Sequence, residues 1–254
     1  MLPLYVASLN SYVSSALRSA RRLTGREPFE AVKRYRLAET AMDRIPDGIN
    51  DQEAMRAFER LRRELAQAEE RLSRILKHDR LIGAQAAPLQ VEHWVSGAPL
   101  TDRDLKGKVV ILDFFAVWCR PSIETFPELA KWREKHGEQG LMIVGLTNYY
   151  NYHWDERTQG PRQTSGEVPQ QTEHEMLQRF AKQHELKHSL GTLTGEDIHN
   201  FYGVTAIPQI VVVDRQGVIR YIGAGNQSEN IPEITALLDK LLGDPKLRDA
   251  TNPR

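Results

Sequence analysis

Residues 109–122 decide the fold of this chain, and they read VVILDFFAVWCRPS. The first seven are almost continuously apolar, which is typical of a strand that is covered on both faces of a sheet. The run ends in Trp118-Cys119-Arg120-Pro121-Ser122, which holds the only cysteine of the protein. Since proline suits the first turn of a helix, Cys119 is predicted to lie between the end of a buried strand and the start of a helix.

This position favours thiol chemistry. The thiolate is the reactive form of cysteine, and the free amides of a helix N-terminus, the helix dipole and the neighbouring Arg120 cation would each lower the thiol pKa. The alternative is that Cys119 is an inert, buried, small apolar residue. One cysteine forms no disulfide within the chain, so cysteine usage gives no indication of the redox compartment.

The flanking segments predict an α/β domain over residues 81–245. A helix between two covered strands makes a parallel βαβ unit, and two later strands separated by the short turn 214–217 make an antiparallel hairpin. Strands are expected at 89–95, 109–115, 141–147, 210–213 and 218–222, and helices at 126–136, 172–183 and 231–242.

The remaining segments are a helical extension over residues 1–80 and a C-terminal tail over residues 246–254. In the extension, apolar residues recur at alternating steps of four and three between positions 54 and 75. This stripe is either the seam of a coiled-coil dimer or the buried face of a helix that packs on a neighbour, and the second interpretation is favoured.

Three motifs, in order along the chain, resemble thioredoxin-fold proteins of the TlpA/ResA-like, AhpC/TSA-related family. Residues 113–122 are similar to the W-C-x-P-C active-site strand and helix start, residues 202–209 to the cis-proline segment, and residues 214–217 with Gly223 to the terminal hairpin. The resemblance covers about residues 83–243. It implies a thioredoxin-like fold, in which helices flank a mixed central sheet.

The resemblance also implies roles for individual residues. Cys119 matches the attacking cysteine, and Asp113 matches a buried carboxylate that assists proton transfer. The alternative is that Asp113 caps or anchors the backbone locally. Pro208, in the cis form, would face Cys119 and leave the Ile207 backbone able to pair with an extended substrate. Ser122 stands at the position of the resolving cysteine, and a serine hydroxyl cannot attack a mixed disulfide, although it can donate a hydrogen bond to the Cys119 thiolate.

The expected activity is therefore monothiol exchange with protein thiols and disulfides or glutathione, without a cofactor, and with release by an outside donor thiol. Trp118, Arg120 and Pro121 are expected to contact the substrate. A one-cysteine peroxidase ranks lower, because that motif needs a threonine and a proline where this chain has Ala116 and Leu112.

An aromatic insertion, residues 148–169, follows the second parallel strand and so emerges at the same sheet edge as Cys119. Its Tyr149, Tyr150 and Trp154 would suit recognition of a partner protein, or they pack down as a lid. These residues support a second hypothesis, a non-catalytic binding module that holds partners in a groove beside Pro208. No metal site is expected here, because no second well-spaced histidine accompanies the one in the insertion.

Charge and hydropathy exclude other classes. The 34 Lys and Arg residues are balanced by 34 Asp and Glu residues, which argues against a nucleic-acid partner. No apolar run reaches the roughly 18 residues of a membrane span, and residues 1–17 make a poor signal peptide. The resemblance nevertheless implies a location outside the cytoplasm, such as the periplasm.

Overall fold

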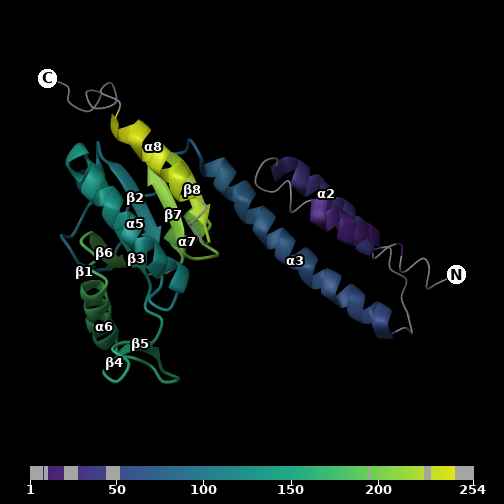
Figure 1. The fold of residues 1–254 in the computed structure, drawn as a ribbon, viewed down its shortest axis with the longest axis horizontal. Coiled ribbons are helices and arrows are strands. Elements are labelled where there is room, and N and C mark those ends of the chain that lie inside the picture. Colours follow the sequence, from purple (N-terminus) through teal and green to yellow (C-terminus); the bar gives the residue numbers. More distant parts are fainter. Residues whose placement is uncertain are drawn as a thin grey trace. The chain divides into compact units, whose positions relative to one another are not determined.

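The structure is a computed structural model that describes residues 8, 11–19, 28–43, 52–193, 195–225 and 230–243 (Figure 1). The chain divides into two compact units, Met1–Arg80 and Leu81–Arg254. The predicted tail 246–254 lies outside the described residues. Among the helices that the structure describes, none combines the length and the apolar character needed to cross a bilayer.

The first unit is helical, with α2 (Pro28–Met42) and the long α3 (Gln52–Leu81) as its main elements. The stripe side chains Phe58, Leu61 and Leu65 are buried. They share a core with Leu17 and with side chains of α2, including Ala31, Tyr35 and Ala38. The stripe is therefore the buried face of a helix packed on its neighbours within this unit.

The second unit is built on a six-stranded mixed sheet in the order β1-β6-β3-β2-β7-β8. Strand β3 runs parallel to both β2 and β6, whereas β1, β7 and β8 are antiparallel to their neighbours. This is the predicted βαβ unit with its terminal hairpin. The strands are β1 (His93–Ser96), β2 (Val109–Phe114), β3 (Leu141–Thr147), β6 (Ser189–Thr192), β7 (Gln209–Val213) and β8 (Ile219–Ala224).

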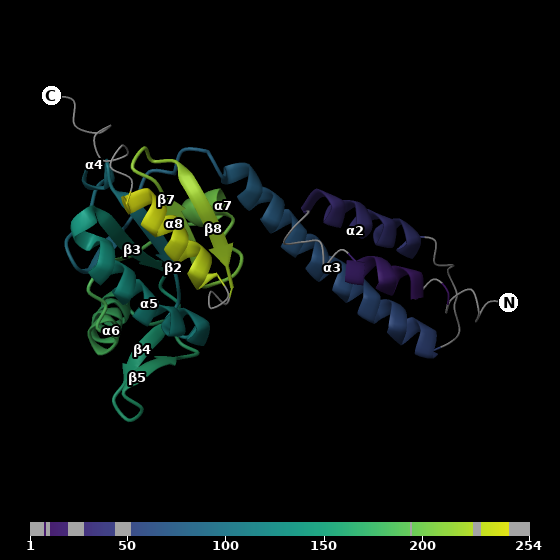
Figure 2. The same ribbon diagram turned by 45° about the horizontal axis from the view of Figure 1, so that its top comes forward.

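Helices cover both faces of this sheet. Helices α5 (Arg120–His136), α6 (Gln170–Gln183) and α8 (Ile231–Gly243) pack with Val109 and Ile111 of β2 on one face. Figure 2 shows α5 and α8 crossing that face. The short helices α4 (Asp102–Leu105) and α7 (Asp197–Tyr202) pack with the alternate residues of β2, such as Leu112, on the other face. All six residues of β2 are buried, as its continuous apolar run predicted.

Turn chemistry fixes the hairpin at the end of the sheet. The Asp214 Oδ1 atom accepts the amides of Gln216 and Val218 at 2.9 Å each, and its Oδ2 atom accepts the Arg220 guanidinium at 2.6 Å. Gly217 has a φ of 78°, which favours glycine at that turn position. The hairpin predicted at residues 210–222 is confirmed.

The strand predicted at residues 89–95 is wrong in its first half, because β1 begins only at His93. The Leu89 amide donates to the Asp102 carboxylate at 2.8 Å instead of to a neighbouring strand. The insertion holds a small separate hairpin, β4 (Tyr152–Asp155) paired with β5 (Gly160–Gln163), which contacts α6.

Candidate active site

Cys119 lies where the chain leaves the buried strand β2 and enters α5. It occupies the N-cap position of α5, with an extended backbone, and its carbonyl accepts the amides of Ser122 and Ile123 at 3.0 and 3.2 Å. Its residue surface is only 7% exposed. Pro121 stands in the first helical turn, where its missing N–H costs no hydrogen bond. The local sequence therefore places the thiol at a helix N-terminus, as predicted.

The segment of Pro208 faces this thiol. The Cys119 Sγ atom lies 3.6 Å from the Ile207 carbonyl oxygen, to which the S–H donates across 88 positions of sequence. The Ile207–Pro208 peptide bond is cis. The Pro208 carbonyl accepts the Gly225 amide at 2.8 Å, which ties this segment to the end of β8. The fold thus brings together two motifs that the sequence places far apart.

Asp113 is buried on the α5 face of the sheet, in the strand that precedes Cys119. It shares that face of β2 with Ile111, and its backbone neighbours are Gly145 of β3 and Ile210 of β7. It is 1% exposed, and neither carboxyl oxygen has a hydrogen-bond partner among the described residues. Burial raises the pKa of the Asp113 carboxyl from 3.8 to about 7. Such a group can hold or release a proton near neutral pH.

Ser122 is fully buried one turn into α5. Its hydroxyl makes no hydrogen bond within the described part of the chain, to the Cys119 sulfur or to any other group. The hydrogen bond expected from Ser122 to the Cys119 sulfur is therefore not made.

An aromatic pair borders the thiol. The Trp118 residue surface is 51% exposed, and the Trp118 ring meets the Tyr150 ring edge to face with centroids 5.9 Å apart. Burial raises the pKa of the Tyr150 phenol above its ordinary value of 10, so the phenol stays neutral at physiological pH. The insertion therefore contributes Tyr150 to the rim of the site.

The other predicted contact residues lie differently. Tyr149 and Trp154 pack against the main core, and the Tyr149 hydroxyl lies 3.2 Å from a His174 ring nitrogen. Two of the three aromatic residues that were predicted to face a partner thus pack down on the core. The Arg120 guanidinium points to the Glu124 carboxylate at 2.9 Å and is 89% exposed.

Glu173 is a buried residue of the site region that the sequence did not single out. It lies in the first turn of α6 and is 2% exposed. Its Oε1 atom accepts the amides of Tyr150 and Tyr152 at 2.6 and 3.1 Å, and its Oε2 atom accepts the Asn151 amide at 3.0 Å. This carboxylate therefore holds the segment that presents Tyr150 to Trp118. No sequence signal pairs a helix residue with amides more than twenty positions earlier.

Metal ligands do not gather in this part of the fold. Across the described residues, no group of three or more His, Cys, Asp and Glu side chains is arranged to hold a metal ion.

Comparison with known proteins agrees with this geometry. The sequence profile of the AhpC/TSA family matches residues 82–222, a span of more than half of the chain that includes Asp113, Cys119 and Pro208. The chain belongs to the AhpC/TSA family, in its TlpA/ResA-like branch. This confirms the resemblance seen in the three motifs, and the mixed sheet with its flanking helices is the thioredoxin-like fold which that resemblance implied.

Similar relatives in this family carry names of thiol–disulfide chemistry. The chain is 26% identical over 158 residues to thiol-disulfide oxidoreductase ResA of Bacillus thuringiensis subsp. konkukian. This match covers 62% of this chain and 79% of the relative. It is 29% identical over 163 residues to thiol:disulfide interchange protein HelX of Rhodobacter capsulatus, covering 64% of this chain and 77% of HelX.

Among solved structures, a putative thiol:disulfide interchange protein DsbE from Chlorobium tepidum matches 64% of this chain and 98% of its own, with 18% identity and a TM-score of 0.49.

Proposed function

We propose that this protein carries out thiol–disulfide exchange on protein disulfides through Cys119, as a monothiol enzyme without a resolving cysteine. The observation that carries the proposal is the contact between the Cys119 thiol and the Ile207 carbonyl, at 3.6 Å, next to a cis-proline. We infer that the main chain beside Ile207 pairs with an extended partner segment next to the sulfur. The names of the ResA and HelX relatives support the same chemistry.

The exchange begins when the Cys119 thiolate attacks one sulfur of a partner disulfide. The partner S–S bond breaks, a new S–S bond joins Cys119 to the partner, and the departing sulfur leaves as a thiolate that takes up one proton. We assign to Asp113 the exchange of this proton, because its pKa of about 7 allows both transfer directions near neutrality.

Release of the partner needs two molecules of an outside thiol, such as glutathione. The first attacks the Cys119 sulfur and frees the partner as a thiol; the second attacks the resulting mixed disulfide and regenerates Cys119. The two donor thiols end as one disulfide, so they supply both electrons. Ser122 takes no part in this release, since its hydroxyl is not a thiol.

The test follows the covalent adduct by intact-protein mass spectrometry. The protein is incubated with a peptide that contains one disulfide, without added thiol, and we expect a peptide adduct on Cys119 that accumulates and disappears when glutathione is added. Cys119→Ser is the control that forms none. In Ser122→Cys the adduct should be short-lived, because a second thiol stands in the same helical turn. Absence of the adduct on the unaltered protein would refute the proposal.

A second candidate is the binding module, in which partners are held at the Pro208 segment and the Trp118–Tyr150 pair without exchange. The half-exposed Trp118 ring supports it, because exposed aromatic rings are favoured at protein interfaces. The pH profile of Cys119 alkylation separates the two functions. A rate that levels off near or below neutrality supports exchange, whereas the profile of an ordinary thiol, with its midpoint at about pH 8.5, supports the module.

The partner surface and the compartment are part of the same proposal. We infer that Trp118 and Tyr150 contact the partner and that the protein works outside the cytoplasm, as the TlpA/ResA resemblance implies. Mass spectrometry of proteins crosslinked to Cys119 in cells would identify both partner and compartment.

Dimerisation through the α3 stripe stays a prediction that the solution mass would test. The stripe's place in a core is the argument against it.

A further inference from the structure

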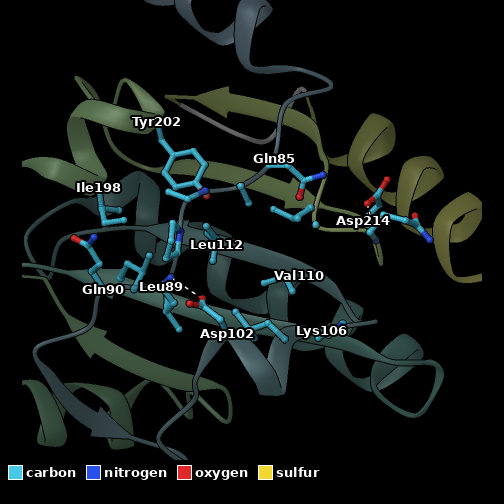
Figure 3. A pocket seen from close by; sticks show the side chains of 18 of the residues that line it. Gln85, Leu89, Gln90, Asp102, Lys106, Val110, Leu112, Ile198, Tyr202 and Asp214 are labelled. Atoms are coloured by element: carbon cyan, nitrogen blue, oxygen red, sulfur yellow. Dashed lines mark hydrogen bonds between the residues drawn. The ribbon is translucent and has the colours of Figure 1, made fainter. Parts of the chain in front are cut away.

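A cavity of about 620 Å³ lies on the α5 side of the sheet, between α5 and the segment 184–188. It is distinct from a cavity of about 550 Å³ on the opposite face, which is lined by Val110, Leu112 and Tyr202 (Figure 3). The sheet separates the cavity of Figure 3 from Asp113, because alternate residues of β2 face opposite cores. Of these two cavities, the one beside α5 therefore lies on the same side of the sheet as the Asp113 carboxyl.

His188 joins this cavity to the sheet. Its side chain lines the cavity, although the residue is only 7% exposed. Its Nε2 atom lies 3.2 Å from the position that a Cβ atom of Gly145 would take, so the ring lies against that glycine. Gly145 is the backbone neighbour of Asp113 in the adjacent strand β3. The missing side chain of Gly145 therefore lets the imidazole approach the strand position beside Asp113.

Asp113 and His188 both carry buried polar atoms that no group in the described part of the chain engages. Neither carboxyl oxygen of Asp113 has a hydrogen-bond partner there, and neither does His188 Nε2. Buried polar groups nearly always pair with the protein or with an ordered water. Neighbouring strands lie about 4.8 Å apart, so one strand spacing separates the Asp113 backbone from the glycine under the imidazole, and a bridging water would satisfy both groups.

The surroundings keep the His188 ring neutral. Burial, and secondly the nearby Arg133 charge, lowers its pKa to about 4. A neutral imidazole has one N–H donor and one free ring nitrogen, so it can accept a proton at one nitrogen and release a proton from the other. On the sheet side, the register places Asp113 beside Gly145. The other charged and titratable groups that line the cavity come from α5 and from residues 184–187, and they are Arg133, Glu134, His184, Glu185 and Lys187.

We propose that His188 relays protons between the Asp113 carboxyl and the water of this cavity. When Asp113 releases its proton, a bridging water passes a proton to Nε2, and the proton on Nδ1 leaves to the cavity. The return transfer runs in reverse and restores the starting tautomer. The inference rests on the proposed function only in that the exchange reaction makes use of the Asp113 proton, because the relay itself needs no reaction at Cys119.

The test follows proton exchange at Asp113 by ¹³C NMR of the full chain with labelled aspartate side chains. Asp113→Asn identifies the Asp113 carboxyl resonance. At the midpoint of its titration, we expect one resonance, averaged by fast proton exchange, in the unaltered protein. In His188→Ala the exchange should slow by about tenfold or more, which broadens or splits the resonance. Added imidazole should restore the average in this variant, which a mere packing defect would not allow.

His184→Ala is the matched control, because His184 lines the same cavity but its ring packs on Phe126 and Phe180. It should keep the averaged resonance. His188→Gln, which is polar but does not titrate, should slow the exchange as His188→Ala does. Cys119→Ser should behave like the unaltered protein, so a failure of the thiol chemistry would leave this result intact. An averaged resonance in both His188 variants, equal slowing in His184→Ala, or a split resonance in the unaltered protein would each overturn the proposal.

Discussion

Replacing Asp113 by asparagine should remove a pH-dependent loss of stability from the second unit. Asp113 is buried without a hydrogen-bond partner among the described residues, and burial raises its pKa from 3.8 to about 7. An acid with a raised pKa binds its proton more tightly in the folded than in the unfolded state. Its contribution to stability is therefore full below pH 3.8 and is lost as the pH rises to about 7.

The magnitude follows from this displacement of the pKa. Each pKa unit corresponds to about 1.4 kcal/mol, so the free energy of unfolding should fall by about 4 kcal/mol over the whole window. Between pH 5 and pH 8.5, which spans most of that window, the expected loss is about 3 kcal/mol. With a urea m-value of about 2 kcal/mol per molar, the midpoint should move by about 1.5 M.

Tryptophan fluorescence during urea unfolding measures this quantity in the right part of the chain. All four tryptophans, at positions 94, 118, 132 and 154, lie in the second unit, so the signal does not follow the helical extension. Asp113→Asn has nearly the same shape and no charge to titrate. Subtracting the pH profile of the free energy of unfolding of Asp113→Asn from that of the unaltered protein removes the contribution of every other titrating group, including His188.

The result that refutes this reasoning is equal pH dependence in the two proteins. If the unaltered protein and Asp113→Asn lost the same stability between pH 5 and 8.5, the Asp113 carboxyl would have an ordinary pKa. Solvent access beneath α5 would then be required, and the proposed proton exchange by Asp113 would lose its basis.

Three further predictions concern other residues of the same unit. Glu173→Ala should lower the free energy of unfolding by about 3–5 kcal/mol, because three amides lose their carboxylate acceptor. In the same urea assay Glu173→Gln should be intermediate, and equal stability of all three proteins would contradict this prediction. Burial, and secondly the nearby Arg133 charge, lowers the pKa of His188 to about 4. The unaltered protein should therefore lose about 3 kcal/mol more stability than His188→Leu as the pH falls from 6.5 to 4. An equal loss in the two proteins would show that His188 does not destabilise the fold in acid. Trp118→Ala should change the free energy of unfolding by less than about 1 kcal/mol, because the residue is half exposed. It should slow adduct formation with a peptide disulfide but not with glutathione disulfide, since the exposed ring contacts only a large partner. Equal slowing with both disulfides would show that the ring acts on the exchange step itself.

Continuous apolar runs and turn residues made much of the fold predictable. The covered strand that ends before Cys119, its parallel neighbour and the hairpin at residues 214–217 follow from local pattern, because burial and turn conformation act over a few residues. The first half of the strand predicted at 89–95 was wrong because side-chain acceptors elsewhere, Asp102 and Tyr202, take two of the amides in and just before that segment. The four-residue strand β6 is too short to show a period.

The sequence by itself determined the candidate thiol, its place before a helix, the family and the serine where that family has a second cysteine. Each of these depends on the identity of residues within short motifs along the chain. Only the tertiary structure decided that the Ile207 carbonyl reaches Cys119, that Tyr150 rather than Tyr149 meets Trp118, and that Glu173 holds that loop. Such contacts join residues 20 to 90 positions apart, and packing of the whole sheet with its helices selects them, so no local pattern could have indicated which atoms would meet.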